Sequence, residues 1–290
     1  MIKLNCWFTG IMLLVAAEAR TQDAITLSGA QPESVSTTQS VPVPVFQDGE
    51  QLTYVLSYGA KLVPNTEAGE IVLNVTRTKL NNTPVWSISG KAKTYSFFRW
   101  FYELNDTFIT WLDEQTLRPV AFSCNIHEGK YRFRSQFRYD WNQMKVFTTY
   151  RNLARNDDKH KTMPLTPYSF DALALFYNLR NVDVSQLKPN EPYKLEIVLE
   201  DTIRKFQYRY VGRETKKVPG TGTFKTLKFI CQIPVNSDEA FESGTEFYLW
   251  VSDDENKIPV YLETPLRVGS ARVKLIKHKN LRYPFSGKIK

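Results

Sequence analysis

Hydrophobic and polar residues alternate with a period of two along most of the chain beyond residue 46. The strictest case is residues 131–139 (YRFRSQFRY), where aromatic rings and one Ser occupy the odd positions and Arg or Gln the even ones. Successive side chains of a strand point to opposite faces, so this pattern predicts a strand with one buried face.

Eleven further segments have the same period, and we expect a strand in each of them. They are residues 52–58, 69–78, 85–92, 106–112, 120–127, 193–200, 205–211, 224–233, 246–252, 258–263 and 271–277. Gly, Asp and Asn between several of these segments are typical of the tight turns that join antiparallel strands.

One segment departs from this period. Thr166 and Pro167 form an N-cap and first-turn pair, and apolar residues follow at helical spacing, which predicts a helix over residues 167–180. A second segment, residues 94–104, is apolar enough to be either a short helix or a buried strand. The chain is therefore expected to be all-β and mainly antiparallel: a curved sheet, half-barrel or sandwich of about a dozen strands with one helix near 167–180.

The N-terminus has the organisation of a secretory signal. Lys3 is followed by an apolar run over residues 8–17 and by the small-residue pattern of residues 17–19, AEA. The run is about ten residues long, whereas a membrane-spanning helix needs about twenty, so we expect cleavage rather than a permanent anchor, with a buried N-terminal helix as the alternative. Residues 20–45 are rich in Ser, Thr, Gln and Pro and predict a flexible leader, which leaves residues 46–284 as a single β-rich domain.

The formal net charge is +8, and removal of residues 1–19 leaves 37 basic and 29 acidic side chains, so the balance is unchanged. A basic surface attracts anionic partners. Because the chain is expected to be exported, lipid headgroups or acidic glycans fit better than nucleic acid.

Aromatic residues make up 13% of the chain, many of them at alternate strand positions. They either fill the core or line a cavity for an apolar ligand, which is a common use of curved sheets. The candidates for ligand contact are Trp100, Tyr131, Phe133 and Trp250. On the opposite face of the 131–139 strand, Arg132, Arg134 and Arg138 form either a solvated surface or an anion-binding one.

The sequence lacks the common catalytic and metal-binding signatures. There is no G-x-S-x-G elbow, and His127, His160 and His278 have no second ligand at metal-binding spacing, so no catalytic residue, metal or cofactor is predicted. Cys124 and Cys231 are expected to lie in strands, either as a disulfide or as two buried thiols.

Five short segments resemble a family of bacterial proteins of unknown function, DUF3108. They are residues 46–54 (FQDGEQLTY), 58–59 (YG), 104–106 (LND), 171–180 ending FYNLR, and 250–254 (WVSDD) leading into 258–260 (IPV). The last is the most specific, and the likeness spans nearly all of the chain after the signal. The resemblance implies export into the envelope of a Gram-negative bacterium and assigns no activity or active-site residue.

Two functions from different classes follow. The first is a periplasmic protein that binds an apolar or amphipathic ligand, such as a lipid or glycolipid. The second is a structural or interaction module that docks to a protein partner in the cell envelope. An enzyme acting on glycans is a third, weaker hypothesis, because it needs two carboxylates facing each other across a cleft.

Overall fold

The computed structural model describes residues 43–60, 63–99, 103–154, 157–233, 245–266 and 269–289. The predicted signal peptide, residues 20–42 of the predicted leader and the candidate Trp100 lie outside these ranges. The last residues of the leader are described. Val45 is buried, and its N–H donates to Asn181 Oδ1 at 2.9 Å, so this part of the segment packs against the folded body.

Within the described residues, fifteen strands form one continuous sheet in the order β8-β7-β6-β5-β4-β3-β2-β1-β15-β14-β13-β12-β11-β10-β9. The strands are β1 (Gln51–Ala60), β2 (Val63–Leu80), β3 (Thr83–Thr94), β4 (Asn105–Asp113), β5 (Pro119–Glu128), β6 (Tyr131–Asp140), β7 (Lys145–Asn152), β8 (Lys159–Pro164), β9 (Ser169–Phe170), β10 (Pro192–Val198), β11 (Ile203–Val218), β12 (Gly222–Ile233), β13 (Thr245–Ser252), β14 (Pro259–Pro265) and β15 (Ser270–Lys279). All neighbouring pairs are antiparallel except β9 with β10.

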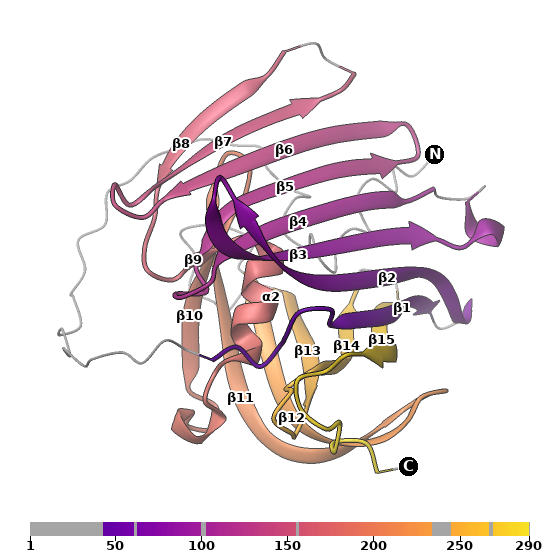
Figure 1. Ribbon diagram of the computed structural model, residues 1–290. Helices are drawn as coiled ribbons and strands as arrows, with labels where there is room; N and C mark the ends of the chain where they lie inside the picture. The colour runs from indigo at the N-terminus through magenta and orange to yellow at the C-terminus, as the bar shows by residue number, and fades with distance from the viewer. Residues whose placement is uncertain are drawn as a thin grey trace.

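The sheet curls around helix α2 (Ala172–Arg180) (Figure 1). We call β1–β8 its N-terminal half and β9–β15 its C-terminal half. The two halves also meet away from their shared β1–β15 pairing. Ser135 on β6 and Thr148 on β7 both donate hydrogen bonds to Glu200, which follows β10. The far edges therefore approach each other without joining strand to strand, and the sheet stays an open, curved one.

The predicted fold class is confirmed, and each of the twelve predicted strands is present. Three strands were missed: β7, β8 and β9. In β8 (KHKTMP) only Met163 is buried, because it is an edge strand with solvent on most sides, so it carries no alternating pattern. β9 has only two residues, too few to show a period.

The helix is shorter than predicted. Helix α2 (Ala172–Arg180) begins at residue 172, and its N-cap is Asp171, whose Oδ1 accepts from the N–H groups of Leu173 and Ala174 at 3.1 and 2.9 Å. The predicted start at Thr166 and Pro167 is wrong, because Ser169 and Phe170 pair with β10 instead. In the ambiguous 94–104 segment, residues 96–98 form a 3-10 turn, η1 (Ser96–Phe98). No helix in the described part of the chain is long and apolar enough to cross a membrane.

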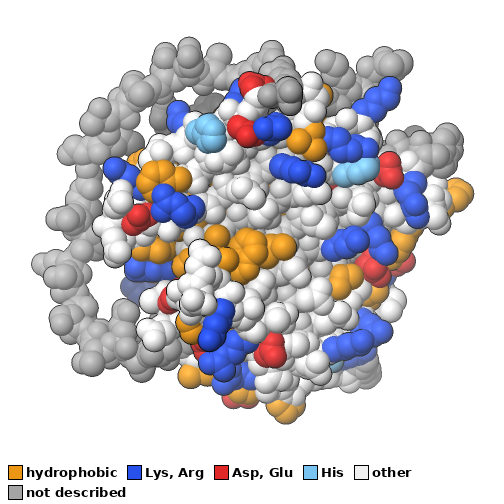
Figure 2. Space-filling view, turned by 45° about the horizontal axis from the view of Figure 1, so that its top comes forward, with side chains coloured by type: hydrophobic (Ala, Val, Ile, Leu, Met, Phe, Trp, Pro, Cys, Tyr) orange, Lys and Arg blue, Asp and Glu red, His pale blue; other side chains and the backbone are white. Residues whose placement is uncertain are grey.

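The face alternation predicted for residues 131–139 is confirmed in β6. Phe137 and Tyr139 are buried, whereas Arg134 and Arg138 on the other face are exposed. In the view of Figure 2, Lys and Arg side chains are scattered among acidic ones rather than gathered into one patch, and apolar side chains lie near the centre of the face.

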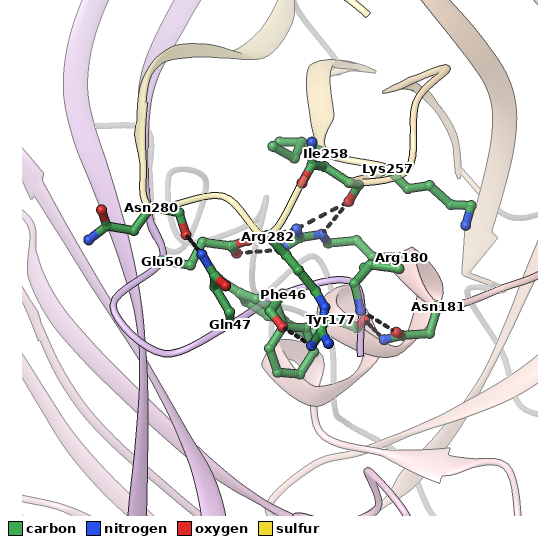
Figure 3. A network of polar contacts seen from close by, with 12 residues as sticks. Phe46, Gln47, Glu50, Tyr177, Arg180, Asn181, Lys257, Ile258, Asn280 and Arg282 are labelled. Carbon is green, nitrogen blue, oxygen red and sulfur yellow. Dashed lines mark hydrogen bonds and ion pairs between the residues drawn. The ribbon is translucent and has the colours of Figure 1, made fainter. Parts of the chain in front are cut away.

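A buried ion pair fixes the C-terminal end of α2 (Figure 3). Arg180 and Glu50 are 1% and 0% exposed, and the guanidinium donates to the two carboxylate oxygens at 2.6 and 3.0 Å. Arg180 Nε and Nη2 also donate to the backbone oxygen of Asn256, in the β13–β14 turn, at 3.2 and 3.1 Å. This bidentate geometry, together with the carbonyl contact, uses four of the five N–H donors of Arg180.

The same network reaches the C-terminal segment. Asn256 donates to the backbone oxygens of Tyr283 and Pro284 and accepts from the N–H of Tyr283. Gln47 donates to the backbone oxygens of Asn280 and Leu281. The N-terminal segment, α2, the β13–β14 turn and the C-terminal segment are thus tied at one place.

We expect Arg180→Met to lower the free energy of unfolding by about 3–5 kcal/mol, because it leaves the Glu50 carboxylate buried without its counter-charge. The double substitution Glu50→Leu with Arg180→Met should recover most of this loss, since no uncompensated charge remains. Urea unfolding of the wild type, both single variants and the double variant measures the cycle. Equal losses in the single and double variants would contradict this account.

Candidate functional site

An apolar cavity of about 140 Å³ lies between α2 and the inner face of the sheet. Its walls come from α2, from β1 and β2, and from much of the C-terminal half. The lining residues are Tyr54, Ile71, Leu73, Ala172, Leu175, Phe176, Leu179, Ile197, Phe206, Cys231, Ile233, Phe247, Leu249, Pro259, Tyr261, Leu262 and Val273. Nearly all of these side chains are hydrocarbon, so the cavity offers little to water and much to an apolar group.

Helix α2 presents two different apolar faces. Leu173, Ala174 and Tyr177 are fully buried. Ala172, Phe176 and Leu179 follow one another at i, i+4 and i+7, so they share one face, and this face lines the cavity. Each of these three side chains is only half-buried. The helix therefore leaves apolar surface incompletely covered on the side of the cavity.

The opposite wall follows the alternation of β13. Phe247 and Leu249 line the cavity, and both are half-buried. Trp250, the next residue, points to the other face. An adjoining hollow of about 50 Å³ shares Phe176, Leu179 and Leu249 with the cavity and adds Arg180 and Lys257 to its lining. The apolar space thus continues toward the Arg180 end of the helix.

The ring of Tyr54 forms part of the cavity wall, whereas its hydroxyl is enclosed by the protein. Tyr54, on β1, is 4% exposed, and its hydroxyl has no hydrogen-bond partner among the described residues. Burial raises the pKa of Tyr54 well above its ordinary value, so the phenol stays protonated.

The ligand-contact candidates chosen from the sequence lie elsewhere. Trp250 packs on the outer face, where Lys216 Nζ lies 3.4 Å from its ring centroid and its Nε1 donates to Glu214. Tyr131, the first residue of β6, is 40% exposed and stacks on Phe133 with ring centroids 6.0 Å apart. None of these three lines the cavity, and their role in ligand binding stays a prediction.

The three arginines of β6 lie on one face of the strand but make different contacts. Arg132 donates to the backbone oxygens of Gly129 and Tyr131, and Arg134 donates to Asn125 Oδ1 at 3.4 Å. The guanidinium of Arg138 lies 4.1 Å from the ring centroid of Phe147. Anion binding by this face also stays a prediction.

A larger hollow, of about 610 Å³, lies over strands β2–β7. Its lining combines Trp111 and Phe147 with Gln136, Arg138 and Thr149. Mixed aromatic and charged walls of this kind are typical of protein interfaces rather than of apolar ligand sites.

Buried carboxyls lie on the inner face of the N-terminal half and at the start of α2. Asp106 is fully buried, and its Oδ1 accepts from the N–H of His127 at 2.8 Å, yet its burial raises the pKa to about 7. Glu128 is buried close by. Asp171 accepts from Thr110 Oγ1 at 2.8 Å, and burial raises its pKa to about 6. None of these carboxyls lines any of the three hollows described above, so the facing pair that a glycan hydrolase needs is not assembled there.

The two cysteines left open by the sequence are separate buried thiols. Cys124 Sγ lies 3.1 Å from Ser135 Oγ, and burial raises the pKa of Cys124 to about 12. Cys231 lines the cavity, and burial raises its pKa as well. Both are therefore protonated and unreactive at neutral pH.

Comparison with known proteins gives a family and a fold. The model of a family of proteins of unknown function, DUF3108, matches residues 53–276. No curated protein matches the chain. The chain is similar to the β-barrel-like protein of domain of unknown function DUF1849 from Brucella abortus, with a TM-score of 0.54 and 9% identity over 81% of this chain and 99% of that one. It also aligns with lipoprotein LppX of Mycobacterium tuberculosis over 81% of this chain and 89% of that one, at 12% identity and a TM-score of 0.23. The first likeness supports the fold, and the second is too low to bear on it.

We expect Asp106→Asn to change how stability depends on pH. The carboxyl has an ordinary pKa of 3.8 and a folded pKa of about 7, so the native state holds the proton more tightly. Its contribution to stability is therefore present at low pH and is lost as pH rises from about 4 through 7.

The Asn variant lacks this loss, so its stability relative to the wild type should increase by about 2–4 kcal/mol between pH 4.5 and pH 8. Urea unfolding at both pH values measures the difference, with the exposed Glu255→Gln as control. A wild type and an Asn variant with parallel pH profiles would contradict the assignment.

Proposed function

The chain belongs to the DUF3108 family, and we propose that it is an exported envelope protein that binds an apolar or amphipathic ligand, such as a lipid or glycolipid, beneath α2. The observation that carries the proposal is the half-buried apolar face of the helix. Ala172, Phe176 and Leu179 are half-buried and face an apolar sheet wall across the cavity, whereas Leu173, Ala174 and Tyr177 of the same helix are fully buried. An apolar chain in that space would complete the burial.

The energetics favour hydrocarbon over water in this space. A cavity without several polar partners stays dry, because an ordered water needs two to four of them. Each methylene group that an acyl chain buries contributes about 0.8 kcal/mol. A few buried carbons are therefore enough for measurable binding once the cost of association is met.

The cavity volume limits what can enter. About 140 Å³ is close to the roughly 150 Å³ of an engineered apolar cavity that binds benzene. The space therefore suits a ring or the end of one acyl chain, with the remainder of the ligand outside. The adjoining hollow at Arg180 and Lys257 extends this path toward polar groups.

The location belongs to the same proposal. A cleaved signal over residues 1–19 and a leader over residues 20–45 would deliver the domain to the periplasm or envelope of a Gram-negative bacterium, where acyl chains are abundant.

The second candidate is an interaction module of the envelope. The feature that favours it is the hollow over β2–β7, where Trp111, Phe147 and Arg138 supply residue types enriched at protein interfaces. In that case the cavity beneath α2 would have no ligand.

We expect Ala172→Trp to abolish binding, because the indole would occupy the cavity from the first turn of α2. Binding is measured by native mass spectrometry of the purified protein with extraction of its bound lipid, and by titration with the fluorescent fatty acid cis-parinaric acid. The wild type should retain lipid and enhance the fluorescence, and Ala172→Trp should do neither.

The matched control is Asn178→Trp, which places the same side chain on the same helix at a position that does not line the cavity. This variant should bind as the wild type does. If the wild type carries no lipid and does not bind the probe, or if both Trp variants bind equally, the proposal fails.

A further inference from the structure

The hollow over β2–β7 is a groove on the outer face of the sheet, and differences in side-chain size create it. Residues that pair directly across antiparallel strands share a face of the sheet. Two neighbouring rows of such residues cross from β4 to β7: Trp111, Ala121, Arg138 and Phe147, and then Ile109, Ser123, Gln136 and Thr149. All of them except Ile109 line the hollow. In both rows β5 contributes a small side chain, so it forms the floor, and the walls on β4 and β6 stand two strand spacings apart, about 10 Å.

Two hydrogen-bonding groups on these walls are available to a ligand. Trp111 is half-buried on the β4 wall, and Gln136 is exposed on the β6 wall. Within the described residues, neither the indole N–H of Trp111 nor the side-chain amide of Gln136 forms a hydrogen bond, and neither group is enclosed by the protein. Both can bond to water in the free protein, so they cost the fold nothing and can exchange that water for a ligand.

The charge of the groove is positive. Arg138 is the single charged residue among the described residues that line it, and 62% of its side chain is exposed. The ring of Phe147, 4.1 Å from the guanidinium, supports it from one side. Asp140 Oδ2 lies 3.7 Å from Nη1, which is too long for a hydrogen bond. The guanidinium therefore keeps N–H donors for a carboxylate, and charge complementarity favours an anionic occupant.

A uronic acid unit of a glycan combines the groups that this lining matches. One face of its pyranose ring consists of C–H groups and packs on an indole, its hydroxyls exchange hydrogen bonds with an amide, and its carboxylate pairs with a guanidinium. A chain of such rings is narrow enough to lie between the walls. The folded surface of a protein would contact only their tops and would leave the floor at Ala121 and Ser123 uncovered.

We propose that the groove between β4 and β6 binds an acidic glycan, with a sugar ring on Trp111, its hydroxyls on Gln136 and its carboxylate on Arg138. The groove shares no lining residue with the cavity beneath α2. The inference therefore goes beyond the proposed function, and it stands or falls independently of lipid binding. The protein partner of the second candidate function is the alternative that the experiment must separate from a glycan.

The test uses the trimer of α-1,4-linked galacturonic acid and its methyl ester, which keeps the sugar rings and removes the charge. Binding to the purified protein is followed by NMR at the indole N–H signal of Trp111, assigned from its absence in Trp111→Ala. The wild type should bind the acid more tightly than the ester, and the difference should shrink at high salt. Arg138→Gln should weaken acid binding about two- to fivefold and leave ester binding unchanged. Trp111→Ala, measured by calorimetry, should weaken both about two- to tenfold.

The matched control is Arg213→Gln, which removes the same charge from an exposed side chain of β11 outside the groove. This variant should bind both trimers as the wild type does. Hexaglutamate serves as the probe for an acidic protein partner, because it has the charge without the sugar ring. The proposal is overturned if neither trimer shifts the Trp111 signal or if the two Arg variants weaken acid binding equally. Equal binding of hexaglutamate and the acid trimer would also overturn it.

Discussion

The buried pair of Glu50 and Arg180 is the constraint on which the arrangement around the helix depends. Two charges removed from water are tolerated only when their geometry is complete, so the segments that supply and surround them must come together in one arrangement. Glu50 comes from the chain just before β1, Arg180 from the last turn of α2, and the accepting carbonyl of Asn256 from the β13–β14 turn. Sequence-distant parts of the sheet are joined through one guanidinium, and the helix that bears it is held inside the curve.

The cavity follows from how the helix is held. At its first turn, Asp171 caps the helix and also accepts from Thr110 on β4. At its last turn, Arg180 is bound to Glu50. Thr110 belongs to the N-terminal half of the sheet and Glu50 to the segment that leads into it, and Arg180 also donates to Asn256 in the β13–β14 turn. These polar contacts hold the two ends of α2. Between them, the face with Phe176 and Leu179 meets the sheet through apolar side chains, and it lines the cavity.

Twelve strands could be predicted from the sequence because their period of two is a local property. In β7 the alternation weakens after Thr148, where four half-buried residues follow, and this strand was missed. An edge strand such as β8, wetted on most sides, has no such pattern. The helix start was misplaced because pairing of β9 with β10 is a tertiary effect that overrides the capping signal of Thr166. The apolar residues of Ala172–Leu179 run almost all round the helix, which is the sign of a helix covered on every side. This pattern indicates that the sheet surrounds α2, and it would have made the side chains of α2 candidates for the cavity wall.

Strand β13 shows why the candidate site was harder to predict. The alternating pattern predicts that Trp250 and Leu249 lie on opposite faces of the sheet, but it does not indicate which face is concave. Curvature is set by the whole sheet, and it placed Leu249 in the cavity and Trp250 outside. The segments that resemble DUF3108 contain Glu50 and Arg180, which form the buried ion pair, and Tyr177, which packs in the core. They also contain Trp250, which packs on the outer face. The DUF3108-like segments therefore contain the residues that hold α2 in place. The same helix segment contains Phe176 and Leu179, so the motif that anchors α2 also supplies the apolar face that lines the cavity.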